Sequence, residues 1–277
     1  MLGELVRFQS IRSRLLEVYA SAYASMKIYF RYPMWFISDI VTTPLWIVII
    51  FMPILLFLPE SEWRNPEIIE AMYWGMIFLD LISLTLWGIG MSIRREQQQG
   101  TIEYLFITNA SRAVIFSNRV FSRILSLLMD VAYIALIINL IFGVSITIVN
   151  PIELFVYLAI SVLLALGLGM MYGAVVLYLK NPGALNNILQ FIILGLGGIF
   201  IPPSRMPYPL NIVSLAIPFS YAIDLVRNAA MGTQTMIDKN LEIFILLVST
   251  MASIITGRYI LSKLEEVNKR SGKLGTY

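Results

Sequence analysis

Six long apolar stretches, separated by short polar turns, form the main hydrophobic pattern of this chain. They cover residues 34–58, 71–91, 121–143, 152–179, 184–201 and 241–261. A helix needs about 20 apolar residues to cross the hydrocarbon core of a bilayer. Helices also satisfy their own backbone hydrogen bonds, which lipid cannot do. The pattern therefore predicts an all-α polytopic membrane protein with six transmembrane helices.

One long polar run, residues 94–109, lies between the second and third apolar stretches. Within it, Ile102, Leu105 and Phe106 have the i, i+3, i+4 spacing of one helix face. Most of the other side chains in the run are polar or charged. We therefore expect a short amphipathic helix at the membrane surface. Because two spans would hold it in place, a soluble partner could push on it, and we interpret the run as a docking surface.

Two further segments depart from the alternation of span and turn. Residues 15–30 mix apolar and charged side chains, which is typical of a helix lying along the lipid headgroups, although an ordinary cytosolic lead-in helix is an alternative. Residues 202–232 are apolar but broken by proline. They predict two short helices, 212–217 and 221–226, separated by Pro218. Re-entrant helices that dip into the membrane and return fit this composition.

Lys and Arg are distributed unevenly between the two sides of this predicted topology. Of the 20 basic residues, 16 fall on the side that holds both termini and the polar run. Lys and Arg mark the cytosolic side of membrane proteins. We therefore expect a multi-pass protein of the plasma membrane, with cytosolic N- and C-termini and a cytosolic polar run.

The composition indicates one membrane domain over residues 1–277. Hydrophobic residues make up 58% of the chain and charged residues 13%, against roughly 25% charged residues in a soluble domain. We expect an N-terminal cytosolic and interfacial segment (1–33), a six-span part (34–261) and a cytosolic tail (262–277).

The residue types that are missing exclude several kinds of chemistry. The chain has no Cys and no His, which rules out disulfides, Cys- or His-ligated metal sites and catalysis by a His base. It also lacks the Gly-x-x-x-x-Gly-Lys-Ser/Thr phosphate loop. We therefore expect no enzyme activity, no metal and no cofactor in this chain. If ATP powers it, another subunit holds the ATP and Mg²⁺.

Three carboxylates, Asp39, Asp80 and Asp130, lie inside the predicted spans. Ionisable residues at membrane depth are costly and are functional candidates by default. Two explanations stay open: a structural role, such as hydrogen bonding between helices, or contact with a substrate or ion.

Other polar and small residues have simpler explanations. Arg227 follows Asp224 at i, i+3 on one short helix, so a local ion pair is expected. Gly169 and Gly173, with Ala165, form a small-residue face for close helix packing. Tryptophans are candidate anchors at the membrane interface, and Trp87 could instead face a cavity. The tryptophans considered are Trp35, Trp63, Trp74 and Trp87.

Two motifs give the chain a family resemblance. The pattern Glu96-x-x-x-Gly100-Thr101-x-Glu103-x-Leu105, after the second span, resembles the first cytosolic loop of ABC-2 type ABC transporter permeases. The stretch before the last span is similar to the same family. Its matching residues are Gly198, Pro203, Met206, Pro207, Pro218, Tyr221 and Arg227. An N-terminal interfacial helix ending near Pro33 also matches, so the resemblance covers nearly the whole chain.

The resemblance implies a permease that works with partners. Members pair two six-span permeases, as a homodimer or a related heterodimer, with two cytosolic ATPase subunits. The polar run, about residues 94–108, would be the coupling helix that sits in a groove of the ATPase. The ATPase-coupling positions would be Arg95, Glu96, Gly100, Thr101, Glu103, Leu105 and Phe106. Membrane lipids are the remaining partner, and no nucleic acid is expected.

The resemblance also implies a substrate path between the permeases, bordered mainly by the second and fifth spans. We assign to it Asp80, Trp87, Asp130 and Gln190. A re-entrant gate would cap the path with Pro203, Pro207, Pro218, Tyr221 and Arg227. The expected activity is ATP-driven export of an amphipathic or hydrophobic substrate (a drug, lipid-linked molecule or peptide) by alternating access. An ion-coupled secondary transporter or channel that uses the intramembrane Asp residues is the alternative, and an intramembrane enzyme relying on carboxylates is a third class.

Overall fold

The protein is built from helices, and no strand occurs in the part of the chain that the structure describes. The computed structural model describes residues 33–100, 118–176 and 182–271, with residue 179 and a few single positions between 16 and 31. In chain order the main helices are α2 (Pro33–Leu56), α3 (Pro66–Ser83), η2 (Leu84–Gly90), α4 (Met91–Gln98), α7 (Asn118–Phe142), α8 (Pro151–Val176), α9 (Pro182–Leu196), α10 (Leu210–Leu215), α11 (Pro218–Met231) and α12 (Lys239–Ser271). Of the predicted interfacial helix only single positions are described.

Apolar helices occupy all six predicted spans, but they differ in length. Among the described residues, three helices are long and apolar enough to cross a membrane: Pro66–Gly88, Pro151–Val176 and Lys239–Ile260. Three shorter apolar helices are Ile40–Leu56, Leu127–Phe142 and Pro182–Leu196. The predicted fifth span was too long. Helix α9 has 15 residues and rises only about 22 Å, against a hydrocarbon core of about 30 Å.

Helices α3, η2 and α4 form one continuous helix that has as many residues as α12. Asn65 caps its start, because its side chain accepts a hydrogen bond from the backbone N–H of Glu67, and Pro66 fills the first position. The helix ends at Gly100, which has φ of +68°, a conformation that favours glycine. Its 33 residues give a length of about 50 Å.

This helix corrects the prediction of one separate helix over residues 94–108. Residues 94–98 form the end of the helix that carries the second span, and the break comes at Gly100. Gly100 interrupts the helix because a left-handed residue cannot continue it. The remaining part of the predicted coupling helix, residues 101–108, lies outside the described residues.

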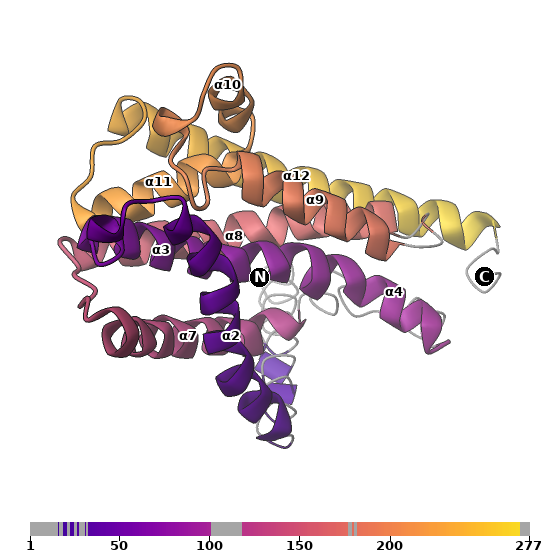
Figure 1. The fold of residues 1–277 in the computed structure, drawn as a ribbon. Helices are drawn as coiled ribbons and strands as arrows, with labels where there is room; N and C mark the ends of the chain where they lie inside the picture. The colour runs from indigo at the N-terminus through magenta and orange to yellow at the C-terminus, as the bar shows by residue number, and fades with distance from the viewer. Residues whose placement is uncertain are drawn as a thin grey trace, which may run out of the picture.

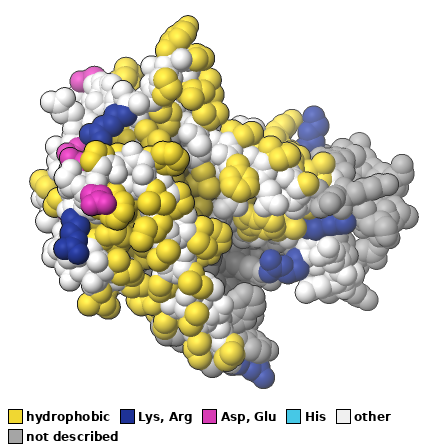
Figure 2. Space-filling model, viewed as in Figure 1, with side chains coloured by type: hydrophobic (Ala, Val, Ile, Leu, Met, Phe, Trp, Pro, Cys, Tyr) yellow, Lys and Arg dark blue, Asp and Glu magenta, His cyan; other side chains and the backbone are white. Residues whose placement is uncertain are grey.

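Most helices run along one direction, while α2 crosses them. Figure 1 shows α3, α8, α9 and α12 extending along the same direction, with α2 running across them in this view. The end of α4 and the C-terminal end of α12 lie at one end of the molecule; the start of α3 and the connection between α7 and α8 lie at the other. Yellow hydrophobic side chains cover much of the surface in Figure 2. In a chain with this many apolar helices, such a surface is suited to lipid.

Helices α8 and α12 pack closely against each other at two glycines. A Cβ atom on Gly167 would lie 2.8 Å from the backbone nitrogen of Ile254, and one on Gly257 would lie 2.9 Å from the carbonyl oxygen of Gly167. Such distances leave no room for a side chain. The predicted small-residue face of Ala165, Gly169 and Gly173 is buried, and Gly167 is a further contact point with α12 that was not predicted.

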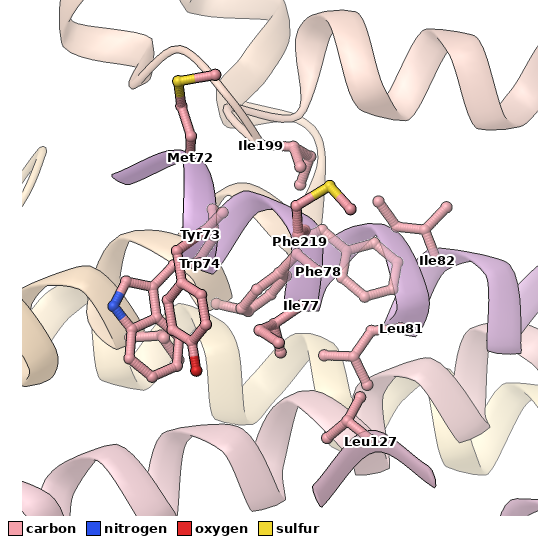
Figure 3. Close-up of a cluster of buried hydrophobic side chains, with 14 of the residues drawn as sticks. Met72, Tyr73, Trp74, Ile77, Phe78, Leu81, Ile82, Leu127, Ile199 and Phe219 are labelled. Atoms are coloured by element: carbon pink, nitrogen blue, oxygen red, sulfur yellow. The ribbon is translucent and has the colours of Figure 1, made fainter. Parts of the chain in front are cut away.

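Helix α3 carries the centre of the hydrophobic core. Figure 3 shows its side chains surrounded by residues from other elements. Phe78 of α3 packs edge-on against Phe219 of α11, with ring centroids 6.5 Å apart. Trp74 is 0% exposed, so its prediction as an interface anchor was wrong. The core fixes α3 in place, and the sites below are built around it.

The proline-rich stretch forms two short helices, as predicted. Helix α10 precedes Pro218, and Pro218 occupies the first turn of α11. Helix α11 is longer than predicted, and side chains on all its faces are buried. Its end receives two backbone hydrogen bonds from the α7–α8 connection: Val149 N to Ala230 O (2.9 Å) and Asn150 N to Ala229 O (2.8 Å). It is therefore an internal helix that other elements enclose.

Candidate functional site

A cavity of about 520 Å³ lies between α2, α3, α7 and α9. Its walls are mostly aliphatic and aromatic, with Trp46, Phe191 and Phe200 among them. Its polar lining residues are Thr42, Thr43, Asp80, Ser83, Asp130, Asn187 and Gln190. A mainly apolar wall with a few polar groups is the usual composition of a small-molecule site.

The cavity brings together the four residues assigned to the substrate path. Asp80, Asp130 and Gln190 lie in its wall and come from α3, α7 and α9. Trp87 joins them because its indole Nε1 donates a hydrogen bond to Gln190 Oε1 at 2.8 Å. Gln190 Nε2 in turn lies 3.5 Å from Ser83 Oγ. Asp80 and Asp130 each have interaction partners in the protein.

Two hydrogen bonds from tyrosine hydroxyls to backbone carbonyls join α7 to α3 and to α2, which form the neighbouring walls of the cavity. Tyr73 of α3 donates its hydroxyl to the carbonyl oxygen of Val131 at 2.8 Å. Tyr133 donates to the carbonyl oxygen of Ile40 on α2 at 2.7 Å. Both bonds use residues that follow Asp130 within one turn of α7. They fix the carboxylate of α7 relative to the helices on either side.

The cavity opens to the surface of the single chain between α2 and α9. Trp46 is 53% exposed and Phe191 is 73% exposed, so both aromatic walls reach the outside. An opening that leads from an apolar surface to two carboxylates is costly in lipid. The exposed edges therefore indicate a side of the molecule that needs covering.

The inner end of this site lies on a π-helical segment that the sequence analysis missed. Segment η2 contains Trp87 and interrupts the α-helical winding between α3 and α4. A π-helical segment inside an α-helix is rare and is found often at functional sites. Gly88 and Gly90 lie in the segment and were the available signal, since glycine weakens an α-helix.

The five residues assigned to the gate surround the end of α9 and the start of α11. Arg227 is 2% exposed. Its guanidinium donates to the carbonyl oxygens of Gly198 (2.7 Å), Ala71 (3.0 Å) and Ile199. The prediction that Arg227 pairs with Asp224 was wrong, because its guanidinium binds these backbone carbonyls instead. Asp224 Oδ2 instead accepts the backbone N–H of Met236 at 2.8 Å, because both side chains reach elements far along the chain.

The remaining gate residues shape the turns around this arginine. Tyr221 donates its hydroxyl to the carbonyl oxygen of Leu215 at 2.7 Å and thereby joins α11 to α10. Pro203 is buried and would touch a Cβ on Gly198, whose φ of +70° needs a glycine. The carbonyl oxygen of Pro207 accepts the N–H of Leu210 at the start of α10.

The coupling positions are only partly described. Arg95 lies in the last turn of α4, and Glu96 lies beside it in the same helix. Gly100 forms the turn that ends this helix. Thr101, Glu103, Leu105 and Phe106 lie outside the described residues, as does Ile102.

Two buried acidic groups and one half-buried one, none of them singled out in the sequence, lie at the end of the molecule where α3 begins. Glu70 of α3 is 5% exposed and accepts hydrogen bonds from the N–H and hydroxyl of Thr147. Glu153 of α8 pairs with Lys239 of α12 at 2.6 Å. Glu242 of α12 is 0% exposed. Their signal was available, because each is a carboxylate at the edge of an apolar stretch.

Comparison with known proteins assigns the chain to a family. A family model described as ABC-2 type transporter matches residues 17–231. No match was found among curated proteins. The matched region includes the cavity, the gate segment and the described coupling positions. Because it covers more than half of the chain, this protein belongs to the ABC-2 type transporter family.

Proposed function

We propose that this protein is the permease subunit of an ATP-driven exporter that moves an amphipathic or hydrophobic molecule. The family match makes it a transport permease domain. The observation that carries the rest of the proposal is the cavity, because its apolar walls and few polar groups suit an amphipathic drug, lipid-linked molecule or peptide. Transport follows when the cavity opens alternately to the two sides of the membrane.

Separate ATPase subunits supply the energy, with ATP and Mg²⁺ bound to them. The chain itself has no phosphate-loop sequence. The helix that lines the cavity with Asp80 and Ser83 continues without a break into α4. At about 50 Å, this helix is longer than the hydrocarbon core of about 30 Å. A partner that pushes on α4 and the residues after Gly100 would therefore move one wall of the cavity.

A second permease chain, identical or related, completes the site. The single chain leaves Trp46 and Phe191 exposed at the opening, and the wall behind them contains Asp80 and Asp130. Covering this opening with a second copy keeps the carboxylates away from lipid. The α10–α11 segment with Arg227 forms the gate at the other end of the path.

The proposed topology has six spans in the plasma membrane, with both termini in the cytosol. The three shorter apolar helices reach across by local thinning of the bilayer. In Figure 2, the end where α3 begins shows acidic side chains together with Lys and Arg, whereas the charged side chains visible at the opposite end, among its described residues, are Lys and Arg. This asymmetry supports placing α4 in the cytosol.

The test is copurification of the tagged chain with the ATPase of the same cell, followed by ATP hydrolysis in liposomes. We expect Glu103→Arg to weaken ATPase association or to abolish hydrolysis that depends on the permease. The matched control is Glu60→Arg, an exposed carboxylate at the other end of the molecule. Unchanged association and unchanged hydrolysis in Glu103→Arg would contradict the coupling assignment.

One observation favours a second candidate, an ion-coupled transporter. Asp80 and Asp130 line the same cavity, and intramembrane carboxylates are typical of ion pathways. Transport measured in vesicles that contain the chain without any ATPase distinguishes the ion-coupled transporter from the ATP-driven exporter. Uptake driven by an imposed proton or sodium gradient alone would favour the ion-coupled function, and its absence together with ATP-dependent transport would favour the exporter.

A further inference from the structure

A buried carboxyl group at the start of α12 has no ordinary partner. Glu242 lies one turn after Lys239 and is 0% exposed. Within the described part of the chain, no N–H or O–H group donates a hydrogen bond to either of its oxygens. The group at hydrogen-bonding range is the carboxyl of Asp224 on α11. Glu242 therefore faces another acid in a buried position.

Asp224 occupies the joint between α11 and α12. It is 5% exposed, and its Oδ2 accepts the backbone N–H of Met236, 12 residues further along. Met236 belongs to the connection between the two helices. The carboxyl group of Asp224 thus holds this connection on one side and meets Glu242 on the other.

The basic groups around the two acids are engaged with other acceptors. Arg227, on the same helix as Asp224, donates to three backbone carbonyls near the end of α9 and the start of α3. Lys239 of α12 pairs with Glu153 of α8 at 2.6 Å. Arg205, before α10, pairs with Glu67 of α3 at 3.1 Å.

The remaining titratable groups nearby that the structure describes are tyrosines and acids, so none of them supplies a positive charge to the pair. They are Tyr157 on α8, Tyr221 on α11, Asp238 before α12 and Glu70 on α3. Tyr221 donates to the carbonyl oxygen of Leu215, and Asp238 accepts the N–H groups of the first turn of α12. Glu70 accepts from Thr147. Two ionised carboxylates in contact, both buried, repel each other strongly.

We propose that Asp224 and Glu242 form a proton-binding site that fastens α11 to α12. One carboxyl is neutral and donates its O–H to an oxygen of the other, so the pair holds one proton and one negative charge. Arg227, three residues after Asp224 on the same helix, lies close enough to balance that charge. The proton belongs to the pair rather than to either residue.

Loss of this proton weakens the joint. The deprotonated pair places two negative charges side by side in a buried position, and separation of α11 from α12 relieves the repulsion. In the unfolded chain both carboxyls are ionised above about pH 5, so near neutral pH the folded protein holds one proton more than the unfolded chain. The sign follows from proton linkage: stability is highest at acidic pH, falls as the pH rises from the pKa of the unfolded carboxyls to that of the folded pair, and is constant above it.

The test uses the purified full chain in detergent micelles, without any ATPase, at pH values from about 5 to about 9. Between the pKa of the carboxyls in the unfolded chain and the pKa of the folded pair, we expect the unfolding equilibrium constant of the wild type to rise about tenfold per pH unit relative to Glu242→Gln. Tryptophan fluorescence during heating follows the unfolding. Asp224→Asn keeps an oxygen acceptor for Met236 and is expected to lose the same pH dependence.

A second buried carboxylate serves as the control, and an infrared band of the protonated carboxyl gives an independent check. Glu70→Gln changes a buried carboxylate that already has donors, and it should retain the wild-type pH dependence. Infrared spectra of the wild type at neutral pH should contain the C=O band of a protonated carboxyl, and Glu242→Gln should lack it. Absence of that band in the wild type, or unchanged pH dependence in Glu242→Gln, would overturn the proposal. Stabilisation by added Na⁺ or Ca²⁺ in place of acid would also overturn it, because a metal cation would then occupy the site.

Discussion

Replacement of Arg227 by methionine tests whether one buried side chain holds three elements together. Arg227→Met keeps much of the volume of the side chain but removes all its donors. The carbonyl oxygens of Gly198 and Ile199 then lose their partner inside the protein, while Ala71 O can still take part in the helix bonding of α3. Each buried carbonyl left without a donor costs about 1–3 kcal/mol. The expected loss of stability is therefore about 2–6 kcal/mol.

The matched control is Arg205→Met, which removes an arginine from the same region. Arg205 is paired with Glu67 at 3.1 Å, but its side chain is 64% exposed. Exposed ion pairs of this kind contribute about 0–1 kcal/mol. The assay is the thermal midpoint of each purified variant in detergent, where about 1 kcal/mol corresponds to roughly 2–4 °C for a chain of this size. Equal midpoints for the two variants would refute the assignment of Arg227 as the bond between α3, α11 and the end of α9.

Two other substitutions test packing and the cavity. Gly167→Ala should lower stability by about 1–3 kcal/mol, because its Cβ would collide with α12; Gly195→Ala, with open space at the same atom, should be neutral or raise the midpoint. Trp87→Phe keeps an aromatic ring but removes the donor to Gln190, and we expect reduced transport with a stability change of no more than about 1.5 kcal/mol. Thermal midpoints and transport assays check these results, and an unchanged transport rate in Trp87→Phe would argue against its place in the path.

The apolar helices, and the two helices α10 and α11 around Pro218, could be predicted because their signals are local. A run of apolar residues predicts a helix wherever it lies, and Pro218 restricts the backbone whatever its neighbours are. The gathering of Asp80, Asp130 and Gln190 was also anticipated. It followed from the family resemblance together with the rarity of polar residues in apolar stretches.

The features that could not be predicted depend on contacts between residues far apart in the sequence. Trp74 suits a lipid interface and a protein core equally well, and only the packing around α3 shows that it is buried. Arg227 has an acid at i−3, but its acceptors are backbone carbonyls up to 156 residues away. The close contact at Gly167 depends on Gly257 of the neighbouring helix α12. No pattern within one helix contains that information.

The continuous helix from Pro66 to Gln98 connects the core, the cavity and the surface in a fixed order. Its first part is buried among other helices, its middle lines the cavity, and η2 carries Trp87 at the point where α4 begins. A π-helical segment gives locally weaker winding than an α-helix. A displacement of α4 would therefore reach the hydrogen bond between Trp87 and Gln190 before it reached the tightly packed side chains around Phe78. The end of the site at Trp87 can thus respond to a displacement of α4 while the core around Phe78 stays in place.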